Sequence, residues 1–579
     1  MRLGRISLTG VVRDGGALTP ADLAFARDAA GALAASPARP KVTVLQSDFL
    51  AVAIAPADSR DASAQVAESR WEQSLAAGVT TAVTDPAAPS SHLSQLFTER
   101  DLDGLEVIRG DLAGVIWDPG RRRLLLLRDA LGRRPLFYAM PPGEGVLLFS
   151  SQVAALLQYP GLRREPKVEA FAEARVFGFP VTPDLTPFSG VSQVVPGNVM
   201  EFSGGRLSTR ASLPFPQAAG TGVSAEQSLA RLLLAAVTDA IGGGGRPAVL
   251  LSGGLDSSLL AASVATSAAS GTAYTLIDRT AAASNRDDVN TARRVAESLN
   301  WEHVLVPFDS DTWIDLLPDL ILSHEAFWPA SVFDPGGDAG FFAVGRAAAG
   351  AQPPHSCVLA GEAADELFGG YWMFRFPLGF VERLRLRADT VGPLVRRQVS
   401  DRFPLPEDRL SCRREVYNLL AGPGLFNYHC WCVDRTARWW GMPLATPYLD
   451  DAVVAAAMAI PLDGHIHGNT GKLILRSMAQ ALLPPAVADV VASRPKMALP
   501  SAAAGSLRGL GAVLERLFPS DYCGRHPYRS LLATPLDVLS FDLWYALFVT
   551  FAGEKPDGLS VHNLYQDWSH ALPREGPDA

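Results

Sequence analysis

The 579-residue sequence contains only five cysteines, and none of them occurs in the first 356 residues. An odd number of thiols in so long a chain does not build a disulfide framework, so we expect a reducing compartment. Cys430 and Cys432 stand beside His429, but a C-x-C step without a second ligand pair does not match the usual zinc spacings. We therefore predict free, buried thiols. The five are Cys357, Cys412, Cys430, Cys432 and Cys523.

Long apolar runs and long runs of charge are also absent. No stretch approaches the roughly 20 apolar residues that a membrane span requires. The N-terminal segment MRLGRISLTGVVRDGG has no apolar core after its positive charges, which argues against a secretory signal. The net charge of −9 does not favour nucleic acid, which needs a basic face. We expect a cytoplasmic protein without a membrane span and without a nucleic-acid partner.

The composition is that of a globular protein, with 48% hydrophobic and 19% charged residues. The length predicts at least two domains. The first 200 or so residues contain short runs of strand-forming residues between turn residues, which indicates a β-rich domain. These runs are 45–55, 110–117, 123–127 and 146–150, and residues 56–88 are expected to form surface loops and helix.

A Pro-, Gly- and Ala-rich segment, 213–223, marks the expected domain boundary and separates residues 1–215 from residues 224–579. Ser224 and Gln227 form a capping-box pattern that begins a helix, and glycines 242–245 end it. Strands predicted at 248–251, 272–277, 302–306 and 356–360 then alternate with helices, one of them at 292–299. This alternation predicts a doubly wound parallel sheet, and the pattern from residue 404 onward is mostly helical.

The segment 249–258, VLLSGGLDSS, predicts a strand, a tight turn and a helix. The N–H groups of a helix's first turn have no partner inside the helix, and the helix dipole is positive there, so the turn is suited to phosphate. No Lys follows the last Gly, unlike in the common nucleotide loop. Asp256 offers a carboxylate to Mg²⁺. The candidate phosphate-binding residues are Ser252, Gly253, Gly254, Asp256, Ser257 and Ser258.

A second step from strand to loop follows at 356–370, SCVLAGEAADELFGG. Ligands of open α/β sheets lie beyond the carboxyl ends of strands, so Glu362, Asp365 and Glu366 should lie beside the phosphate loop. Asp256 and Asp365 are the predicted Mg²⁺ ligands. The alternative is that these acids only cap and solvate the start of a helix.

Together, SGGLDSS and GEAADELFGGY resemble the synthetase domain of asparagine synthetases and of their relatives, the β-lactam synthetases and lasso peptide cyclases. Residues 434–450, DRTARWWGMPLATPYLD, and residues 471–500 are similar to two further segments of that family. The resemblance implies an ATP-pyrophosphatase (PP-loop) fold that uses ATP and Mg²⁺. It also implies a reaction in which a carboxylate attacks the α-phosphate, pyrophosphate leaves, and an amine displaces AMP to form an amide.

The resemblance also implies roles for individual residues. Lys496 would face both centres of developing charge, although an exposed loop lysine is the alternative. Lys472 and Arg476 would meet pyrophosphate, and Glu362 would lie near the incoming amine, where β-lactam synthetases have Tyr. The remaining expected ATP contacts are Leu250, Leu251, Ile277 and Gly361.

In the N-terminal part, segments 110–113, 124–138 and 149–162 resemble, in order, the later half of the glutamine-hydrolysing, Ntn-hydrolase-like domain of asparagine synthetases. In that family a Cys directly after the initiator Met is the nucleophile, and here the position holds Arg2. Without a nucleophile no acyl-enzyme forms. We therefore expect an inactive glutaminase domain, retained as a scaffold or for partner binding.

Within this family, the sequence favours a lasso peptide cyclase that acts on a precursor peptide, with a leader-binding protein and a leader peptidase as further expected partners. Three features favour it: the missing nucleophile, the Arg-Arg-Pro-Leu-Phe-Tyr run after Gly132, and the divergent aromatic region 521–568. An ammonia-dependent asparagine synthetase is the alternative, because GEAADE is close to its motif. A β-lactam synthetase-like enzyme and a silent scaffold are further alternatives, and the presence of Asp256, Asp365 and Lys496 argues against the scaffold.

Overall fold

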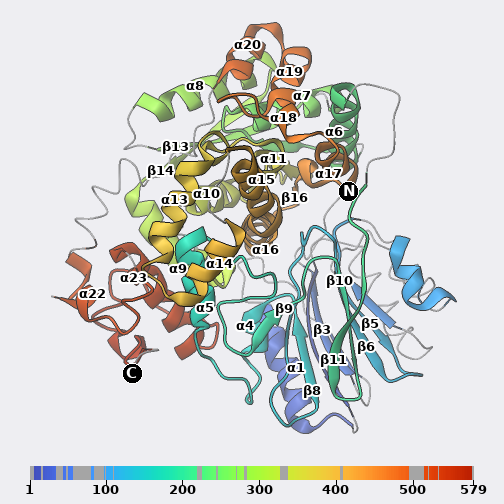
Figure 1. Cartoon of the computed structure of the whole chain (residues 1–579), viewed down its shortest axis with the longest axis vertical. Helices are drawn as coiled ribbons and strands as arrows, with labels where there is room; N and C mark the ends of the chain where they lie inside the picture. Colours follow the sequence, from blue (N-terminus) through green and yellow to red (C-terminus); the bar gives the residue numbers. More distant parts are fainter. Residues whose placement is uncertain are drawn as a thin grey trace.

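The computed structural model shows two domains, one built on antiparallel sheets and one on a parallel sheet (Figure 1). The N-terminal sheets lie at the lower right of Figure 1, and the parallel sheet with its helices lies above them. The structure describes residues 6–14, 17–33, 43–46, 50–56, 80–83, 97, 99–107, 110–217, 225–242, 245–268, 270–278, 283–326, 337–403, 409–494, 514, 516–519, 521–532 and 534–576.

The N-terminal domain contains two antiparallel sheets that pack face to face. The first has the order β2 (Thr43–Gln46), β3 (Leu50–Pro56), β1 (Ile6–Arg13), β8 (Val146–Ser150), β7 (Phe137–Ala139) and β9 (Val191–Gln193). The second has the order β11 (Arg206–Ser212), β10 (Asn198–Ser203), β6 (Arg123–Arg128), β5 (Ala113–Asp118) and β4 (Thr80–Val83). Helices α1 (Pro20–Leu33), α4 (Val153–Leu156), α5 (Val168–Phe177) and the 3₁₀ segment η1 (Asp101–Val107) complete the described part of the domain.

The run of four leucines in β6 shows how the sequence builds this sandwich. Successive side chains of a strand point to opposite faces. Leu124 and Leu126 accordingly join the cluster between the sheets, which includes Phe149 from β8. Leu125 and Leu127 join a separate cluster on the other face of the second sheet. Both faces of β6 are therefore buried.

The second domain is organised around a five-stranded parallel sheet with the order β14 (Glu302–Phe308), β13 (Thr272–Asp278), β12 (Pro247–Leu250), β15 (Cys357–Leu359) and β16 (Leu444–Ala445). All four pairings are parallel. From β12 the chain first adds strands on one side, to β14, and then on the other, through β15 to β16. The switch point between β12 and β15 is where such sheets bind ligands.

Helices cover both faces of this sheet. The described helices are α6 (Ala225–Ile241), α7 (Leu255–Ser267), α8 (Ala283–Ser298), α9 (Ser310–His324), α10 (Gly337–Ala349), α11 (Ala364–Phe368), α12 (Trp372–Arg375), α13 (Pro377–Ala388), α14 (Pro393–Arg402), α15 (Arg409–Leu419), α16 (Cys430–Trp440), α17 (Asp451–Met458), α18 (Leu462–His465), α19 (Leu473–Leu482), α20 (Pro485–Ser493), α22 (Tyr522–Arg525) and α23 (Pro535–Trp544). A π-helical segment, η3 (Leu420–His429), joins α15 to α16, and a second, η5 (Tyr545–Thr550), follows α23. Two short 3₁₀ segments are η4 (Pro447–Leu449) and η6 (Ser569–Ala571).

The predicted fold class is confirmed, and several element boundaries differ from the prediction. The single strand predicted at 45–55 overlaps two antiparallel strands, β2 and β3, and residues 47–49 lie outside the described residues. The helix predicted at 292–299 is the second half of the longer α8. The domain boundary stays a prediction: β11 ends at Ser212 and α6 begins at Ala225, whereas residues 218–224, including Ser224, lie outside the described residues.

The cysteines and the helices agree with two of the expectations from composition. All five cysteines are free, and only Cys523 is partly exposed. Burial raises the pKa of the Cys432 thiol well above its ordinary value, so this thiol stays protonated. None of the helices among the described residues combines the length and the apolar character that a membrane crossing requires.

Buried charged groups join the two domains. Arg133 contacts both Asp111 of its own domain, at 2.9 Å, and Asp451 at the start of α17. Arg134 contacts Asp434 of α16 at 2.8 Å. Asp451 also accepts a hydrogen bond of 2.9 Å from the backbone N–H of Gly110. Because most of these groups are buried, they hold the second domain in a fixed position on the first.

Candidate functional site

The phosphate loop predicted at 252–254 joins β12 to α7. Gly254 caps α7 with an extended backbone, and the first intrahelical bond runs from the N–H of Ser258 to its carbonyl, 3.1 Å. Gly253 has a φ of +77°, and a Cβ there would collide with the backbone carbonyl of Asp288 in α8. Only glycine fits this turn. The first-turn N–H groups of α7 therefore lie in the turn after β12, a position suited to an anion, and phosphate binding there stays a prediction.

Two serines brace the same turn. The hydroxyl of Ser257 accepts from the backbone N–H of Ser252 at 3.2 Å and lies 3.1 Å from the Ser252 hydroxyl. The Ser252 hydroxyl in turn accepts from the N–H of Gly254 at 3.3 Å. These bonds fix the loop before any ligand is bound.

The second predicted loop, after β15, packs directly against the first. A Cβ on Gly361 would lie 3.3 Å from the Cβ of Asp256, so the two loops are in contact. Ala363 has a φ of 74° at the start of α11, a left-handed conformation that a residue with a side chain seldom adopts. Such backbone strain is concentrated at functional sites.

Asp256 and Asp365 meet at one ammonium group. The Nζ of Lys472 contacts Asp256 and lies 2.6 Å from Asp365. The Lys472 side chain is only 4% exposed. The contacts of Lys472 therefore show that the carboxylates of Asp256 and Asp365 surround a single cation position. Tyr448 supports this arrangement, because its hydroxyl donates to the backbone carbonyl of Asp256 at 3.1 Å.

A histidine lies between the acids of the second loop. The Nδ1 of His429 is 3.2 Å from Glu362, and its Nε2 is 2.7 Å from Glu366. The Tyr371 hydroxyl donates to the same Glu366. Burial by itself would lower the pKa of His429, but Glu366 and Glu362 raise it well above its ordinary value. Burial opposes ionisation of Glu366, yet the charge of His429 lowers the pKa of this carboxyl. The cluster is therefore an imidazolium held between two carboxylates.

A cavity of about 290 Å³ connects the phosphate loop to this acid–histidine cluster. Its floor carries Ser252, Asp256 and Asp365, and one side carries Glu362 and His429. Much of its remaining wall is apolar, and includes Phe179, Tyr274, Leu276, Phe341, Val344 and Leu420. The cavity can hold an anionic group at the floor and an amine beside Glu362.

The predicted site residues differ in where the structure places them. Eight line the cavity: Leu250, Leu251, Ser252, Asp256, Ser257, Gly361, Glu362 and Asp365. The turn below the cavity is formed by Gly253 and Gly254, and Lys472 neutralises the charge of the aspartates there. Ser258 is fully buried within α7. Ile277 lies near the end of β13, where Tyr274 and Leu276 line the cavity in its place. Lys496 lies outside the described residues.

Arg476 has a structural contact in addition to its predicted role. Its Nε donates to the carbonyl of Gly471 at 2.9 Å, and its Nη1 donates to the carbonyl of Ala492. These bonds tie the start of α19 to the end of α20. They thereby hold Lys472, which begins α19, in its position between the two aspartates.

The sequence analysis did not select His429, Tyr371 or Tyr448 as site residues. Tyr371 follows the second motif directly, and Tyr448 is the aromatic residue of the Pro-aromatic-Leu-Asp segment, so position within the motifs was an available signal. The rarity of lysine was a second available signal. Only five of the 51 basic residues are lysine, and Lys472 is one of them.

Comparison with known proteins agrees with this geometry. Residues 228–534 match the model of the family described as asparagine synthase, and residues 90–212 match a glutamine amidotransferase domain. A Mycobacterium bovis protein provisionally named glutamine-hydrolysing asparagine synthetase is 25% identical over 77% of this chain and 78% of its own length. Asparagine synthetase 3 of Bacillus subtilis is 24% identical over 67% of each chain.

Among solved structures, the NMN synthetase of Francisella tularensis is similar over 37% of this chain and 92% of its own, at 16% identity and a TM-score of 0.20. The assignment rests on the sequence family, whose model spans more than half of the chain and includes both loops, the acid–histidine cluster and Lys472. The chain belongs to the asparagine synthase family of ATP-dependent carbon–nitrogen ligases, which release AMP and pyrophosphate.

Proposed function

We propose that this ligase closes a macrolactam: it joins the side-chain carboxyl of an Asp or Glu within a precursor peptide to the N-terminal amine of the same peptide, as lasso peptide cyclases do. The observation that carries this proposal is the apolar wall of the cavity. Apart from the floor and the acid–histidine cluster, the charged lining of the cavity is Asp338 and Arg375. Free aspartate would bring an ammonium and a second carboxylate into this mainly apolar space, and burying charges that lack good partners is unfavourable. A peptide side chain brings only the carboxyl that reacts.

The activation step uses the floor of the cavity. The substrate carboxylate attacks the α-phosphorus of ATP, and pyrophosphate leaves with the electrons of the broken phosphorus–oxygen bond. Lys472 and the first-turn N–H groups of α7 stabilise the negative charge on the phosphoryl oxygens. Fixed charges that need no rearrangement during the reaction are effective catalysts.

Asp256 and Asp365 fit a Mg²⁺ ion because both reach the same cation position, that of the Lys472 ammonium. Mg²⁺ is usually bound through one or two carboxylates together with water and phosphate oxygens. Among the described residues no three His, Cys, Asp or Glu side chains are arranged to hold a metal ion. Asp256 and Asp365 would therefore bind the ion together with phosphate oxygens and water. When bound, the ion would neutralise charge on the triphosphate. Lys472 would then pair with phosphate oxygens.

The amide-forming step uses the other side of the cavity. The neutral amine attacks the acyl carbon, and AMP leaves with the acyl–oxygen bond pair. The Glu362 carboxylate accepts the proton that the amine nitrogen loses. The Nδ1 of His429 lies 3.2 Å from Glu362 and positions this carboxyl beside the cavity.

An ammonia-dependent asparagine synthetase is the second candidate. It is favoured by the names of the relatives and by Glu362, which stands where relatives that use ammonia have an acid. In this case aspartate would be the carboxylate and ammonium the nitrogen source. A cytoplasmic location fits both candidates, because both consume ATP and the thiols are free. A leader-binding protein and a leader peptidase are proposed partners of the cyclase alone.

Mass spectrometry separates the two candidates. The full-length protein is incubated with ATP, Mg²⁺ and a candidate precursor peptide that carries an Asp or Glu in its N-terminal part. Cyclisation predicts loss of one water, a blocked N-terminus, and one AMP per product. Asparagine formed from aspartate and ammonium at a comparable rate, with no change in the mass of the peptide, would replace the cyclase by the synthetase.

A further inference from the structure

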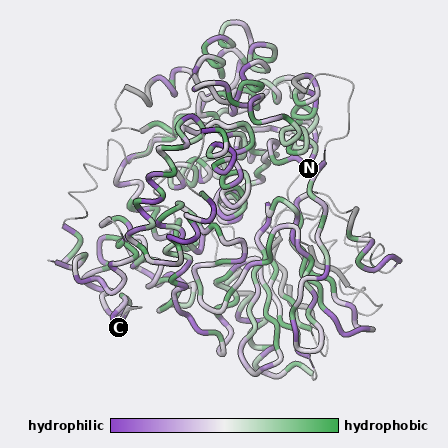
Figure 2. Tube along the Cα trace, in the orientation of Figure 1, coloured by the Kyte–Doolittle hydropathy of each residue, from purple (hydrophilic) through white to green (hydrophobic). Residues whose placement is uncertain are grey.

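Helices α12 to α15 carry a charge opposite to that of the whole protein. The described residues 372–403 and 409–419 contain ten arginines and four acidic residues, whereas the chain has a net charge of −9. Large apolar side chains are exposed in the same region: Phe376 is 54%, Leu378 44% and Leu410 57% exposed. Figure 2 shows hydrophilic and hydrophobic stretches side by side along these helices. Exposed apolar groups rimmed by charge are typical of binding surfaces.

This surface continues from the cavity. Trp372 and Arg375 of α12 line the cavity, and Phe376 is the next residue along the chain. The guanidinium of Arg383 in α13 lies 5.0 Å from the ring of Trp372. The cavity wall therefore continues along α12 to the exposed Phe376, and Trp372 links it to α13.

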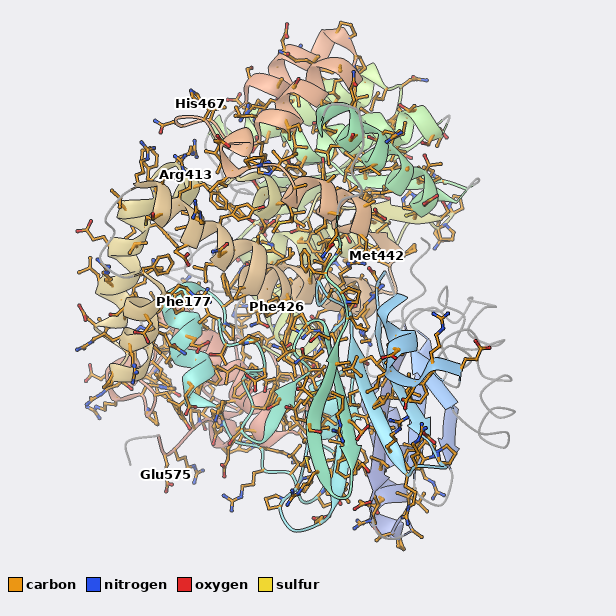
Figure 3. The ribbon with its side chains drawn as sticks, turned by 45° about the vertical axis from the view of Figure 1, so that its right-hand side comes forward. Phe177, Arg413, Phe426, Met442, His467 and Glu575 are labelled. Carbon is orange, nitrogen blue, oxygen red and sulfur yellow. The ribbon has the colours of Figure 1, made fainter. Side chains whose placement is uncertain are left out.

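Two arginines of α15 hold α12 in place. Arg409 donates to the carbonyl of Arg375 at 2.6 Å, and the Nε of Arg413 donates to the carbonyl of Phe374 at 2.8 Å. Arg413 also reaches the carbonyl of Gly468, 3.4 Å away, and Figure 3 labels Arg413 and His467 on neighbouring segments. The surface is thus rigid before a ligand binds, which reduces the entropy lost on binding.

Residues four apart on a helix are neighbours on its surface. Leu410 and Arg414 form one such pair on α15, and Arg409 and Arg413 form another. Leu410 and Arg414 are both exposed, so one large apolar side chain of α15 lies among three arginines. We name this region the α12–α15 surface; its members are Arg375, Phe376, Leu378, Arg409, Leu410, Arg413 and Arg414.

We propose that the α12–α15 surface binds an acidic peptide segment with large apolar side chains and leads its reactive carboxyl past Arg375 into the cavity. The inference rests on the proposed peptide substrate. Charge complementarity favours an acidic partner. The exposed aliphatic side chains of Leu378 and Leu410 favour a peptide over nucleic acid, because nucleic-acid binding relies mainly on cations at the phosphates and on aromatic side chains that stack on the bases.

Fluorescence anisotropy of the full-length protein, without ATP, tests this proposal. The probes are three fluorescein-labelled polymers of equal length: a peptide of alternating Glu and Leu, a peptide of alternating Lys and Leu, and a single-stranded RNA. We expect the Glu-Leu peptide to bind at least tenfold more tightly than the Lys-Leu peptide, with an affinity that falls as salt rises.

The variant Leu410→Ser/Arg414→Glu tests the surface itself. Both side chains are exposed, so the fold should tolerate the change. We expect at least tenfold weaker binding of the Glu-Leu peptide. The matched control is Arg397→Glu on α14, an 82% exposed residue outside the surface, which should retain binding within twofold.

Equal affinity for the two peptides, tighter binding of the RNA, or unchanged affinity in the double variant would overturn the proposal. The result is independent of catalysis because no ATP is present. Loss of affinity in the double variant supports the surface even where no cyclised product forms. Cyclisation by the double variant with unchanged KM and unchanged peptide affinity would overturn the surface and leave the ligase proposal intact.

Discussion

Charged groups are buried at the domain interface and around the cavity, and the two sets differ in what they face. In the N-terminal domain the buried Arg133 and Arg134 pair with aspartates of both domains, so each charge is compensated within the interface. In the second domain, by contrast, Asp256, Asp365 and Glu362 face a cavity. Buried charge in this protein therefore indicates chemistry only where it borders a cavity.

Strand direction explains the difference. Parallel strands end at the same edge of a sheet, so the loops after β12 and β15 are neighbours and their acids converge. Antiparallel neighbours end at opposite edges, so the loops that follow them do not gather in this way. The N-terminal domain contributes Phe179 to the cavity wall, whereas both acidic loops follow strands of the parallel sheet.

Asp256→Asn is expected to have the largest effect on catalysis. The change removes one of the two carboxylates at the cation position and should lower pyrophosphate release by about 10³-fold or more. Steady-state pyrophosphate release measures it, with the exposed Asp463→Asn as the matched control. Near-normal release in Asp256→Asn would refute the assignment of the metal site.

Arg134→Met should mainly affect stability. It removes one of the two arginine partners of Asp434, which keeps Arg438, and one of the two of Asp111, which keeps Arg133. Because the charge of two buried carboxylates is then less well compensated, we expect the free energy of unfolding to fall by about 3 kcal/mol. Urea unfolding measures this, and the 84% exposed Arg163→Met is the control. We expect the folded variant to keep most of its pyrophosphate release. A loss of chemistry without a loss of stability would show that the interface takes part in the reaction.

Glu362→Gln should separate the two steps. Proton acceptance typically contributes about 10²-fold, so amide formation should fall by that factor. Exchange of labelled pyrophosphate into ATP reports the first step and should change less than threefold. The partly exposed Glu169→Gln on α5 serves as the control. An equal loss in both assays would assign Glu362 to activation.

The His429 cluster predicts a pH dependence of stability. The folded pKa of His429 is raised, so its contribution is complete below the unfolded pKa of about 6.5 and is lost as pH rises toward the folded pKa. The difference in unfolding free energy between the wild type and His429→Gln should therefore shrink above pH 6.5 by about 1.4 kcal/mol per pH unit. A difference that is constant from pH 6.5 to 8.5 would contradict the charged imidazole.

The lowered pKa of Glu366 acts at the other end of the pH range. Its contribution is present above the unfolded pKa of about 4.3 and is lost as pH falls toward the folded pKa. Together the two shifts place the greatest stabilisation by the cluster between about pH 4.5 and 6.5.

The last prediction concerns the N-terminal domain, for which we expect no measurable glutaminase activity. Glutamine should not be hydrolysed, because residues 1–356 contain no cysteine to form the acyl-enzyme. Glutamate release from glutamine, followed by an enzyme-coupled assay, should not exceed that of a sample without protein. Glutamate formed in proportion to the protein would give the N-terminal domain a nucleophile of another kind and would weaken the contrast between the domains.

The sequence was sufficient to predict the convergence of the two loops. Short apolar strands followed by Ser252-Gly253-Gly254 and by Gly361-Glu362 specify strand–turn–helix steps, and parallel topology then brings them to one edge. The meeting of Asp256 and Asp365 follows from that rule. The position of Lys472 between them does not, because it depends on a φ of +58° at the start of α19.

Long-range pairs account for most of what sequence patterns could not predict. His429 is 67 residues from Glu362 and reaches it from η3, a π-helical segment with a non-helical backbone at Gly422. Arg134 and Asp434 are 300 residues apart. Local periodicity carries no information about such contacts, since they are set by how whole helices pack.

The most direct test of the central claim is the fate of ATP labelled in its α-phosphate, with precursor peptide or with aspartate and ammonium as substrates. In our account the two acidic loops surround the phosphates and a carboxyl group attacks the α-phosphorus. We therefore expect the label to appear in AMP, with one pyrophosphate and one amide formed per AMP. Label in ADP, with release of inorganic phosphate in step with amide formation, would contradict the account.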